Sequence, residues 1–262
     1  MAEFQVKYDN TPFLKTSKTS AHANRLNWRC ELLFTRNAGI VRGKRVLDLA
    51  SHDGRFSYGC LQLGAAHVTG VEVRQHLVDH SIANLTKLGY GEKQFRFVQG
   101  DIFDVLPTFA AGQFDTILCL GVYYHTIRQI ELMRHIQRLQ PAHFVLDTYI
   151  VRERFSVKVS AFLRKRKAEG RWPSNASQFG QWFRAPYLLF REERYSRDGS
   201  TIDPNNIVAA PTKSLVELLL RCHGFREREI LWSQAGINDW SHLDNYKVGK
   251  RVSYLAERVN PA

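Results

Sequence analysis

Three acidic side chains lie near the ends of three successive apolar segments, at Asp48, Glu72 and Asp101. A carboxylate can accept two hydrogen bonds, so Glu72, 24 residues after Asp48, suits both hydroxyls of a ribose. Asp101 is placed to accept from an adenine amino group, and Asp48 from another amino group or from loop amides. One such acid often caps the helix that follows it. Three in succession favour a nucleoside-binding site.

The loop between the first of these segments and the next helix contains small residues, in the order Asp48-Leu-Ala-Ser-His-Asp-Gly54. Small residues let a ligand approach the backbone closely. A nicotinamide dinucleotide fits this loop less well, because its GxGxxG motif places glycines against a pyrophosphate. Here Asp53 would repel that phosphate.

A second group of reactive side chains follows a later apolar run, in the sequence Gly121-Val-Tyr-Tyr-His125. The ordinary pKa of histidine lies near neutrality, so His125 is a candidate base for a hydroxyl proton. Tyr124 is a candidate for orienting the substrate oxygen. The alternatives are that His125 caps the next helix and that Tyr124 only packs.

Asp147, at the end of the next apolar run, is a further catalytic candidate, and His52 is another. A metal-assisted reaction using His52, His125 and Asp147 is conceivable. No HxH or HExxH spacing supports it, so we predict no metal.

Apolar runs of strand length alternate with amphipathic helical patterns through the first 150 residues. Strands are expected at 45–50, 67–73, 95–101, 114–121 and 143–150, and helices at 22–40, 55–63, 75–89 and 127–139. This alternation predicts an α/β fold, a doubly wound and mostly parallel sheet covered on both faces. A helix at 212–225 and strands at 226–232 and 251–259 complete seven strands.

The chain divides into four predicted parts. Residues 1–42 form an N-terminal arm and helix, and 43–150 form the ligand-binding α/β core. Residues 151–210 interrupt the pattern as an inserted cap after the fifth strand, and 211–262 return the last helix and two strands to the core.

The predicted cap begins with a strongly basic segment. Residues 151–171 hold eight Lys or Arg against two Glu, a net charge of +6 out of +12 for the chain. Such a segment could clamp a phosphate or carboxylate, or could be a solvated helix face. Arg164, Trp182 and Arg184 are the candidates for substrate contact.

Composition limits the class of protein. A net charge of +12 suggests an anionic partner without choosing between nucleic acid and a small molecule. No apolar run reaches the length of a membrane helix, and the start does not have the pattern of a signal peptide. The four cysteines are widely spaced, which is typical of reduced thiols in a cytoplasmic protein.

The order of VLDLASHDG, VTGVE, QGD and FDTILCLGVYYH resembles the class I, Rossmann-like S-adenosylmethionine-dependent methyltransferases. The resemblance implies S-adenosylmethionine as cofactor. It places Asp48, Ala50 and Gly54 at the methionine end. Glu72 then binds the ribose, and Asp101 with Ile102 flanks the adenine. The wider implied cofactor-binding set adds Ser51, His52, Val73, Leu120 and Gly121.

One departure from that family stands in the loop after the first strand. The family pattern is acidic-x-Gly-x-Gly-x-Gly. In this chain Ala50 and His52 replace the first two glycines, and only Gly54 is kept. His52 therefore brings a side chain close to cofactor or substrate.

A narrower resemblance is to the methyltransferase-like enzymes that carboxymethylate a hydroxylated wobble uridine in tRNA. It is carried by FDTILCLGVYYHTIRQIELM, HFVLDTYIV and NIVAAPTKSLVELLLRCHGF. These stretches cover about half of the chain. We expect the longer N-terminal region of those enzymes to be missing here.

Three functions follow from these patterns. The first is O-methylation of a small molecule, with an anionic acceptor as one option and the cap closing over it. The second is methylation of tRNA or another RNA at the basic surface. The third is a non-catalytic scaffold that keeps the fold. The sequence leaves the oligomeric state open.

Overall fold

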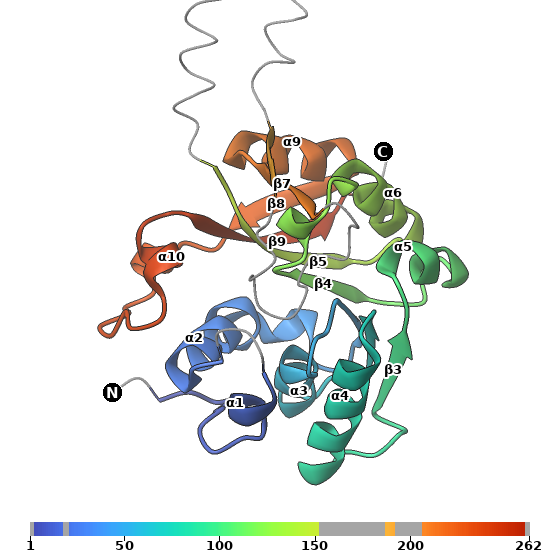
Figure 1. Cartoon of the computed structure of the whole chain (residues 1–262), viewed down its shortest axis with the longest axis vertical. Coiled ribbons are helices and arrows are strands. Elements are labelled where there is room, and N and C mark those ends of the chain that lie inside the picture. Colours follow the sequence, from blue (N-terminus) through green and yellow to red (C-terminus); the bar gives the residue numbers. More distant parts are fainter. Residues whose placement is uncertain (1–2, 18–20, 152–186, 192–205, 260–262) are drawn as a thin grey trace, which may run out of the picture.

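A seven-stranded sheet forms the centre of the computed structural model, which describes residues 3–17, 21–151, 187–191 and 206–259 (Figure 1). The strand order is β3-β2-β1-β4-β5-β9-β8. The strands are β1 (Arg45–Leu49), β2 (His67–Glu72), β3 (Phe95–Gln99), β4 (Thr116–Leu120), β5 (His143–Tyr149), β8 (Phe225–Glu229) and β9 (Arg251–Arg258). The first five are parallel, while β9 runs antiparallel to β5 and β8. The predicted doubly wound, mostly parallel sheet is thus confirmed.

Helices cover both faces of this sheet (Figure 1). One face carries α2 (Ala23–Leu33), α3 (Arg55–Gln62) and α4 (Gln75–Lys87), and the other carries α5 (Ile102–Val105), α6 (Gln129–Leu139) and α9 (Lys213–Cys222). Neighbouring strand residues serve opposite faces: Val46 packs into one hydrophobic cluster and Leu47 into the other. Burial on both sides explains why the strands read as continuous apolar runs.

The helices present apolar stripes to these clusters. In α6, Leu132, Ile136 and Leu139 are all fully buried at helical spacing. The helix expected at 22–40 is in fact two elements, because α2 ends at Leu33 and a 3₁₀ helix, η1, follows at Thr35–Ile40.

The N-terminal residues, expected to form an arm or loop, pack into the core. Val6, Tyr8 and Phe13 are buried, the last in the short helix α1 (Phe13–Thr16). The Tyr8 hydroxyl donates a hydrogen bond to the Arg55 carbonyl at 2.6 Å. This contact ties the N-terminal segment to the start of α3.

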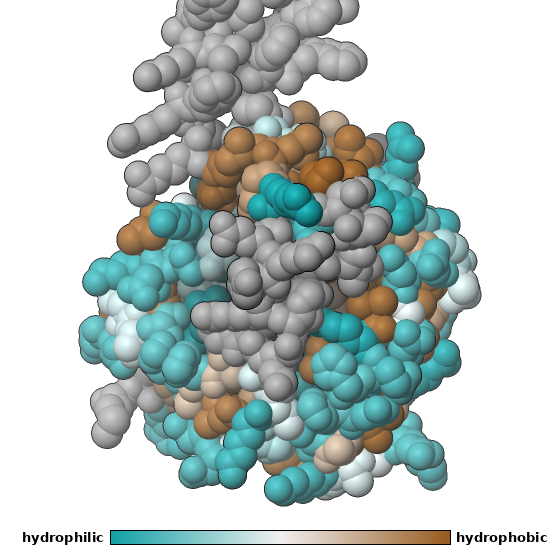
Figure 2. Space-filling model, viewed as in Figure 1, coloured by the Kyte–Doolittle hydropathy of each residue, from teal (hydrophilic) through white to brown (hydrophobic). Residues whose placement is uncertain are grey.

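The predicted cap contains a strand pair that the sequence pattern did not indicate. Strand β6 (Tyr187–Arg191) pairs antiparallel with β7 (Ile207–Pro211), and three of its side chains, Leu188, Leu189 and Phe190, are exposed. On the face seen in Figure 2, hydrophobic surface also gathers over α9, which carries the exposed Leu218. The substrate candidates Arg164, Trp182 and Arg184 lie outside the described residues.

Several short elements complete the chain. They are the 3₁₀ helices η2 (Leu106–Thr108), η3 (Tyr123–His125) and η5 (Trp232–Gln234), and the helix α10 (Asp244–Lys247). Of these, η3 follows β4 and α10 precedes β9, so both lie near the carboxyl edge of the parallel strands. Within the described ranges, no helix combines the length and the apolar character needed to span a membrane.

Candidate functional site

The loop after β1 has a backbone that glycine would normally supply. Ala50 has φ of 51°, His52 of 56° and Gly54 of 81°, so all three lie in the left-handed region. These are the three positions at which the family pattern has glycine. A non-glycine residue in this region costs about 1–2 kcal/mol. The loop therefore keeps the family backbone, although two of its glycines have been replaced.

Close packing around residue 54 leaves little room for a side chain, which favours glycine there. A Cβ at this position would lie 3.2 Å from the Ser81 Cβ and 3.3 Å from the Phe97 ring. Hydrogen bonds hold the strained neighbours: the Ser51 amide donates to the Val71 carbonyl at 3.0 Å, and the Ser81 hydroxyl donates to the His52 carbonyl at 2.9 Å.

The His52 ring lies between an acid and an arginine. Its Nδ1 accepts from the Asp53 amide at 2.8 Å, and it lies 2.6 Å from an Arg55 guanidinium nitrogen and 3.2 Å from Asp53 Oδ1. Burial, together with the charge of Arg55, lowers the pKa of His52 despite the opposing Asp53 carboxylate. The Nε2 atom is buried and finds no hydrogen-bond acceptor among the described residues.

Glu72, at the end of β2, is held by its neighbours. Its Oε1 accepts from the Arg74 amide at 3.1 Å and the Arg74 Nε at 2.8 Å. Its Oε2 accepts from the His52 amide at 3.0 Å and the Arg74 Nη2 at 3.3 Å. A carboxylate offers about four acceptor positions, so the Arg74 side chain occupies the two that a ribose diol would need.

Asp101 both caps a helix and lines a pocket. One of its oxygens accepts from the Phe103 amide at 2.9 Å, which caps α5. Asp48 is deeper, buried and accepting from the Ser57 hydroxyl at 2.8 Å. Burial raises the pKa of Asp48 to about 7, against the opposing effects of Ser57 and Arg55.

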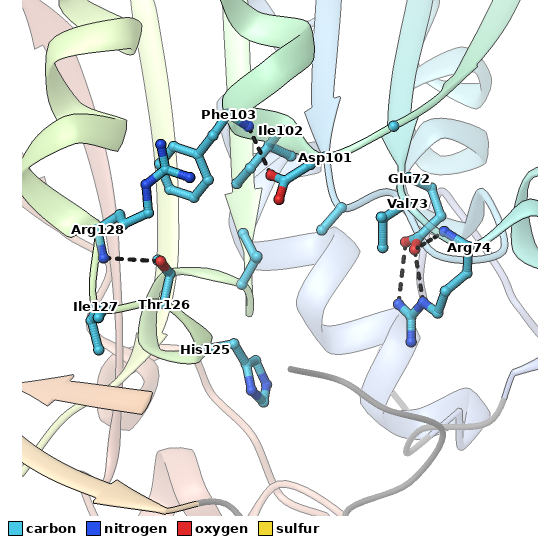
Figure 3. A pocket seen from close by; sticks show the side chains of 13 residues that line it. Glu72, Val73, Arg74, Asp101, Ile102, Phe103, His125, Thr126, Ile127 and Arg128 are labelled. Carbon is cyan, nitrogen blue, oxygen red and sulfur yellow. Dashed lines mark hydrogen bonds and ion pairs between the residues drawn. The ribbon is translucent and has the colours of Figure 1, made fainter. Parts of the chain in front are cut away.

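A pocket of about 240 Å³ brings part of this set together. Figure 3 shows the acids from the ends of β2 and β3 on one side and the segment from His125 to Arg128 on the other. We call it the strand-end pocket. Its lining residues are Ala50, Glu72, Val73, Arg74, Gly100, Asp101, Ile102, Phe103, Val122, His125, Thr126, Ile127 and Arg128.

The other predicted site residues lie outside this lining. They are Asp48, Ser51, His52, Gly54, Leu120, Gly121, Tyr124 and Asp147. Asp48 lies in β1, and Ser51, His52 and Gly54 belong to the loop after it that carries Ala50. Leu120 and Gly121 directly precede the pocket residue Val122. All of them belong to the carboxyl edge of the parallel strands.

His125 lines the pocket and does not cap a helix. It closes η3, whereas the residue that precedes α6 as its N-cap is Arg128. The Tyr124 ring lies 4.0 Å from the His125 ring and 4.8 Å from the Tyr149 ring, centroid to centroid. The loop after β4 thus joins the pocket to an aromatic group beside β5.

Asp147 is fully buried among four donors. Its Oδ1 accepts from Arg251 Nε and, at 3.2 Å, from Arg29 Nη2. Its Oδ2 accepts from the Tyr246 and Ser253 hydroxyls, each at 2.8 Å. Burial alone would raise the pKa of Asp147, but these partners outweigh it and hold the pKa at about 2. This geometry suits an anchor for the arginines better than an acceptor of substrate protons.

Sequence reasoning missed the arginines that surround these acids. Arg74 is two positions after Glu72 and could have been found from that spacing. Arg25 and Arg29 are four residues apart, hence on one side of the predicted helix. Arg251 had no local signal. As for a metal, no cluster of three or more His, Cys, Asp or Glu suited to binding one occurs among the residues that the structure describes.

With this geometry established, comparison with known proteins decides the family. A family model described as "Methyltransferase domain" matches residues 40–170, half of the chain. The chain belongs to the methyltransferase domain family. This is the family of S-adenosylmethionine-dependent methyltransferases that the sequence motifs resemble, with S-adenosylmethionine as its cofactor. The left-handed β1 loop of this methyltransferase keeps the backbone of the family's glycine-rich pattern.

Two curated relatives match shorter stretches. The tRNA U34 carboxymethyltransferase of Desulforapulum autotrophicum is 26% identical over 132 residues, covering 48% of this chain and 39% of the relative. The ubiquinone biosynthesis O-methyltransferase of Bordetella avium is 35% identical over 102 residues, covering 38% of each. The chain thus spans about two fifths of the length of the curated relatives it matches.

Solved structures share the fold over most of the chain. The PH0226 protein of Pyrococcus horikoshii OT3 superposes with a TM-score of 0.55 at 18% identity, covering 97% of this chain and 98% of the other. The magnesium protoporphyrin IX methyltransferase of Synechocystis PCC 6803, solved with bound SAH, gives 0.51 at 16% identity, covering 98% and 90%. At these identities the likeness concerns the fold alone.

Proposed function

We propose that this methyltransferase transfers the methyl group of S-adenosylmethionine to an oxygen atom of a small molecule. The observation that carries the proposal is the position of His125, which lines the same pocket as Glu72 and Asp101. A base at the wall of a nucleoside pocket can remove a proton from an acceptor beside the cofactor. The partial similarity to an O-methyltransferase supports oxygen as the acceptor atom.

The cofactor residues take the following roles in the proposal. Glu72 holds the ribose hydroxyls, with Val73 beside it, and Asp101 with Ile102 holds the adenine. The methionine end lies against the β1 loop and the end of β4, at Asp48, Ala50, Ser51, His52, Gly54, Leu120 and Gly121. When bound, the cofactor supplies a sulfonium methyl group, which passes to the acceptor oxygen as the sulfur–carbon bond breaks.

The chain itself positions the acceptor and moves one proton. An imidazole nitrogen of His125 takes the proton that the acceptor hydroxyl loses as its oxygen–carbon bond forms. Tyr124, whose ring lies 4.0 Å from that of His125, orients the acceptor. Asp147 acts through the arginines it binds, so in this proposal it is a positioning residue.

The test is methyl transfer from labelled S-adenosylmethionine to a panel of small phenols and hydroxy acids. We expect His125→Ala to reduce turnover by about 10²–10⁴-fold, the usual contribution of a general base. His135→Ala is the matched control, because His135 lies on α6 and outside the pocket lining. Equal activity of the two variants would remove the proposed role of His125.

RNA is the second candidate acceptor. The net charge of +12 and the similarity to the tRNA U34 carboxymethyltransferase favour it. Electrophoretic retention of bulk tRNA at physiological salt tests this candidate, because phosphate contacts dominate such binding. Absence of retention, together with turnover of a small acceptor, would eliminate RNA.

The remaining finer assignments are also proposals. Residues 151–210 close over the acceptor, with Arg164, Trp182 and Arg184 in contact with it, and the protein acts in the cytoplasm. The buried cysteines Cys30, Cys60 and Cys119, all unpaired, are consistent with a reducing compartment. A non-catalytic scaffold is the third candidate, and calorimetry with S-adenosylmethionine tests it: a scaffold that lost the cofactor would not bind.

A further inference from the structure

Three buried arginines converge beside the loop after β4. Arg25 and Arg29 are one turn apart on α2, and Arg251 begins β9. Their exposed fractions are only 7%, 6% and 6%. We call these three residues the arginine cluster.

The acidic partner of the cluster in the described part of the chain is Asp147. It pairs with Arg29 and Arg251. Arg25 instead donates to the His242 carbonyl at 2.8 Å, and its guanidinium lies 5.3 Å from the centre of the Tyr246 ring. Three guanidinium groups and one carboxylate give these residues a net charge of +2, and Arg25 has no acidic partner among them.

Buried charge of this size calls for an anion. Burying an ionised group costs several kcal/mol unless a counter-charge and hydrogen bonds compensate it. Aromatic rings compensate in part, since Arg251 faces Tyr149 at 4.6 Å and Arg29 faces Phe56 at 4.4 Å. They offer no hydrogen-bond acceptor, and the buried Nε of Arg29 has none among the described residues.

The cluster lies on the acceptor side of the proposed active site. In the sheet register Asp147 is opposite Leu120, the last residue of β4. A Cβ on Gly121 would lie 2.9 Å from the Arg251 Nη2, so the guanidinium packs directly against the loop that leads to His125. A cationic methyl donor beside this net positive charge would be repelled unless an anion lay between them.

We propose that the arginine cluster is a binding subsite for a carboxylate group carried by the methyl acceptor, an inference that rests on the proposed function. The planar guanidinium fork matches a carboxylate through two parallel hydrogen bonds. The carboxylate anchors the acceptor and supplies the missing negative charge. The acceptor hydroxyl at His125 belongs to the same molecule.

The experiment measures binding of carboxylate probes to the full chain in the absence of cofactor. Acetate and benzoate are compared with acetamide and benzamide by calorimetry and thermal shift. We expect saturable binding of the carboxylates and none of the amides. Arg29→Gln and Arg25→Gln should each weaken benzoate binding about tenfold, because a charged hydrogen bond is lost. Arg45→Gln is the matched control, since it removes an exposed arginine on strand β1 that pairs with Asp115.

Two variants keep the test decisive if one is poorly folded. Arg25 does not bond to Asp147, so Arg25→Gln leaves that carboxylate its four hydrogen-bond donors. Absence of saturable benzoate binding would overturn the subsite. Benzoate binding that is unchanged in both Arg25→Gln and Arg29→Gln would also overturn it. So would saturable binding of inorganic phosphate when the carboxylates do not bind.

Calorimetry with S-adenosylmethionine on the same samples separates this inference from the function. Cofactor binding without benzoate binding would overturn the subsite alone. If benzoate binds, its affinity falls in the cluster variants and the cofactor does not bind, the methyltransferase function would be overturned and the anion site kept.

Discussion

The two halves of the carboxyl edge of the sheet differ in the charged side chains that they bring together. At the ends of β1, β2 and β3 stand Asp48, Glu72 and Asp101, whereas the cluster beside β5 and β9 consists of Arg25, Arg29 and Arg251. The acidic half suits a ligand that donates hydrogen bonds, such as a nucleoside. The basic half suits one that accepts them. In our proposal, donor and acceptor are therefore recognised by complementary chemistry on either side of the loop after β4.

The largest expected effect is on the basic half. Asp147→Asn should lower the free energy of unfolding by about 3–5 kcal/mol, because it leaves buried guanidinium groups without their counter-charge. Urea denaturation measures this. Asp115→Asn is the control: Asp115 pairs with the exposed Arg45, and such a surface pair contributes under about 1 kcal/mol. Similar losses in both variants would show that the buried pair has no special weight.

The ion pairs of Asp147 with Arg29 and Arg251 also predict a pH dependence of the free energy of unfolding. The folded-state pKa of Asp147 is about 2, below the ordinary value of ~3.9. Its contribution is therefore present above about pH 4 and is lost as the pH falls toward 2. Asp147→Asn should flatten this part of the stability profile.

The next largest effect is expected for a residue of the acidic half. Glu72→Ala should weaken S-adenosylmethionine binding by about 1–3 kcal/mol, through the loss of hydrogen bonds to the ribose. Calorimetry measures the affinity, and Asp79→Ala, which removes an exposed acid on α4, is the matched control. Unchanged affinity in Glu72→Ala would mean that the nucleoside binds elsewhere.

A smaller change sharpens the role of Arg74. Its guanidinium occupies the Glu72 oxygens that the ribose needs, so Arg74→Ala should tighten cofactor binding a few-fold by removing the competitor. Arg74→Lys keeps the charge without the bidentate contact, so its affinity for the cofactor should lie between those of the wild type and Arg74→Ala. Weaker binding in Arg74→Ala would instead make Arg74 a clamp that orients the carboxylate.

The smallest effect concerns Asp48. We propose that ionised Asp48 attracts the cofactor ammonium group. Its folded-state pKa is about 7, so the ionised form appears only as the pH rises through that value. Affinity for S-adenosylmethionine should rise a few-fold across this range, and Asp48→Asn should abolish the rise. Because the folded state holds a proton that the unfolded state has already released above ~4, the same pH increase should lower stability.

The acidic half was predictable from sequence because its residues are local. Each acid follows its own parallel strand, and parallel strands bring their ends to one edge. The departures at Ala50 and His52 looked like the loss of a motif, yet the backbone there is left-handed as the glycines would require. The loop lacks two of the family's glycines but keeps the backbone conformation that they would adopt.

The basic half was not predictable because it depends on strand direction. Both last strands were expected, but hydrophobic patterning does not tell parallel from antiparallel. The antiparallel course of β9 brings its first residue, Arg251, opposite Tyr149 at the carboxyl end of β5. The strand pair β6–β7 was also missed: the apolar side chains of β6 are exposed, so this strand has no buried face for a sequence pattern to reveal.

The antiparallel last strand also has a consequence for synthesis on the ribosome. The lining of the strand-end pocket is complete once residue 128 has been made. The arginine cluster needs residues 25 and 29 from the start of the chain and residue 251 from near its end. A domain generally folds as a unit as it leaves the ribosome, and β5 has the last strand, β9, as its neighbour in the sheet. A nascent chain stalled before residue 251 would therefore leave one edge of β5 without its partner strand.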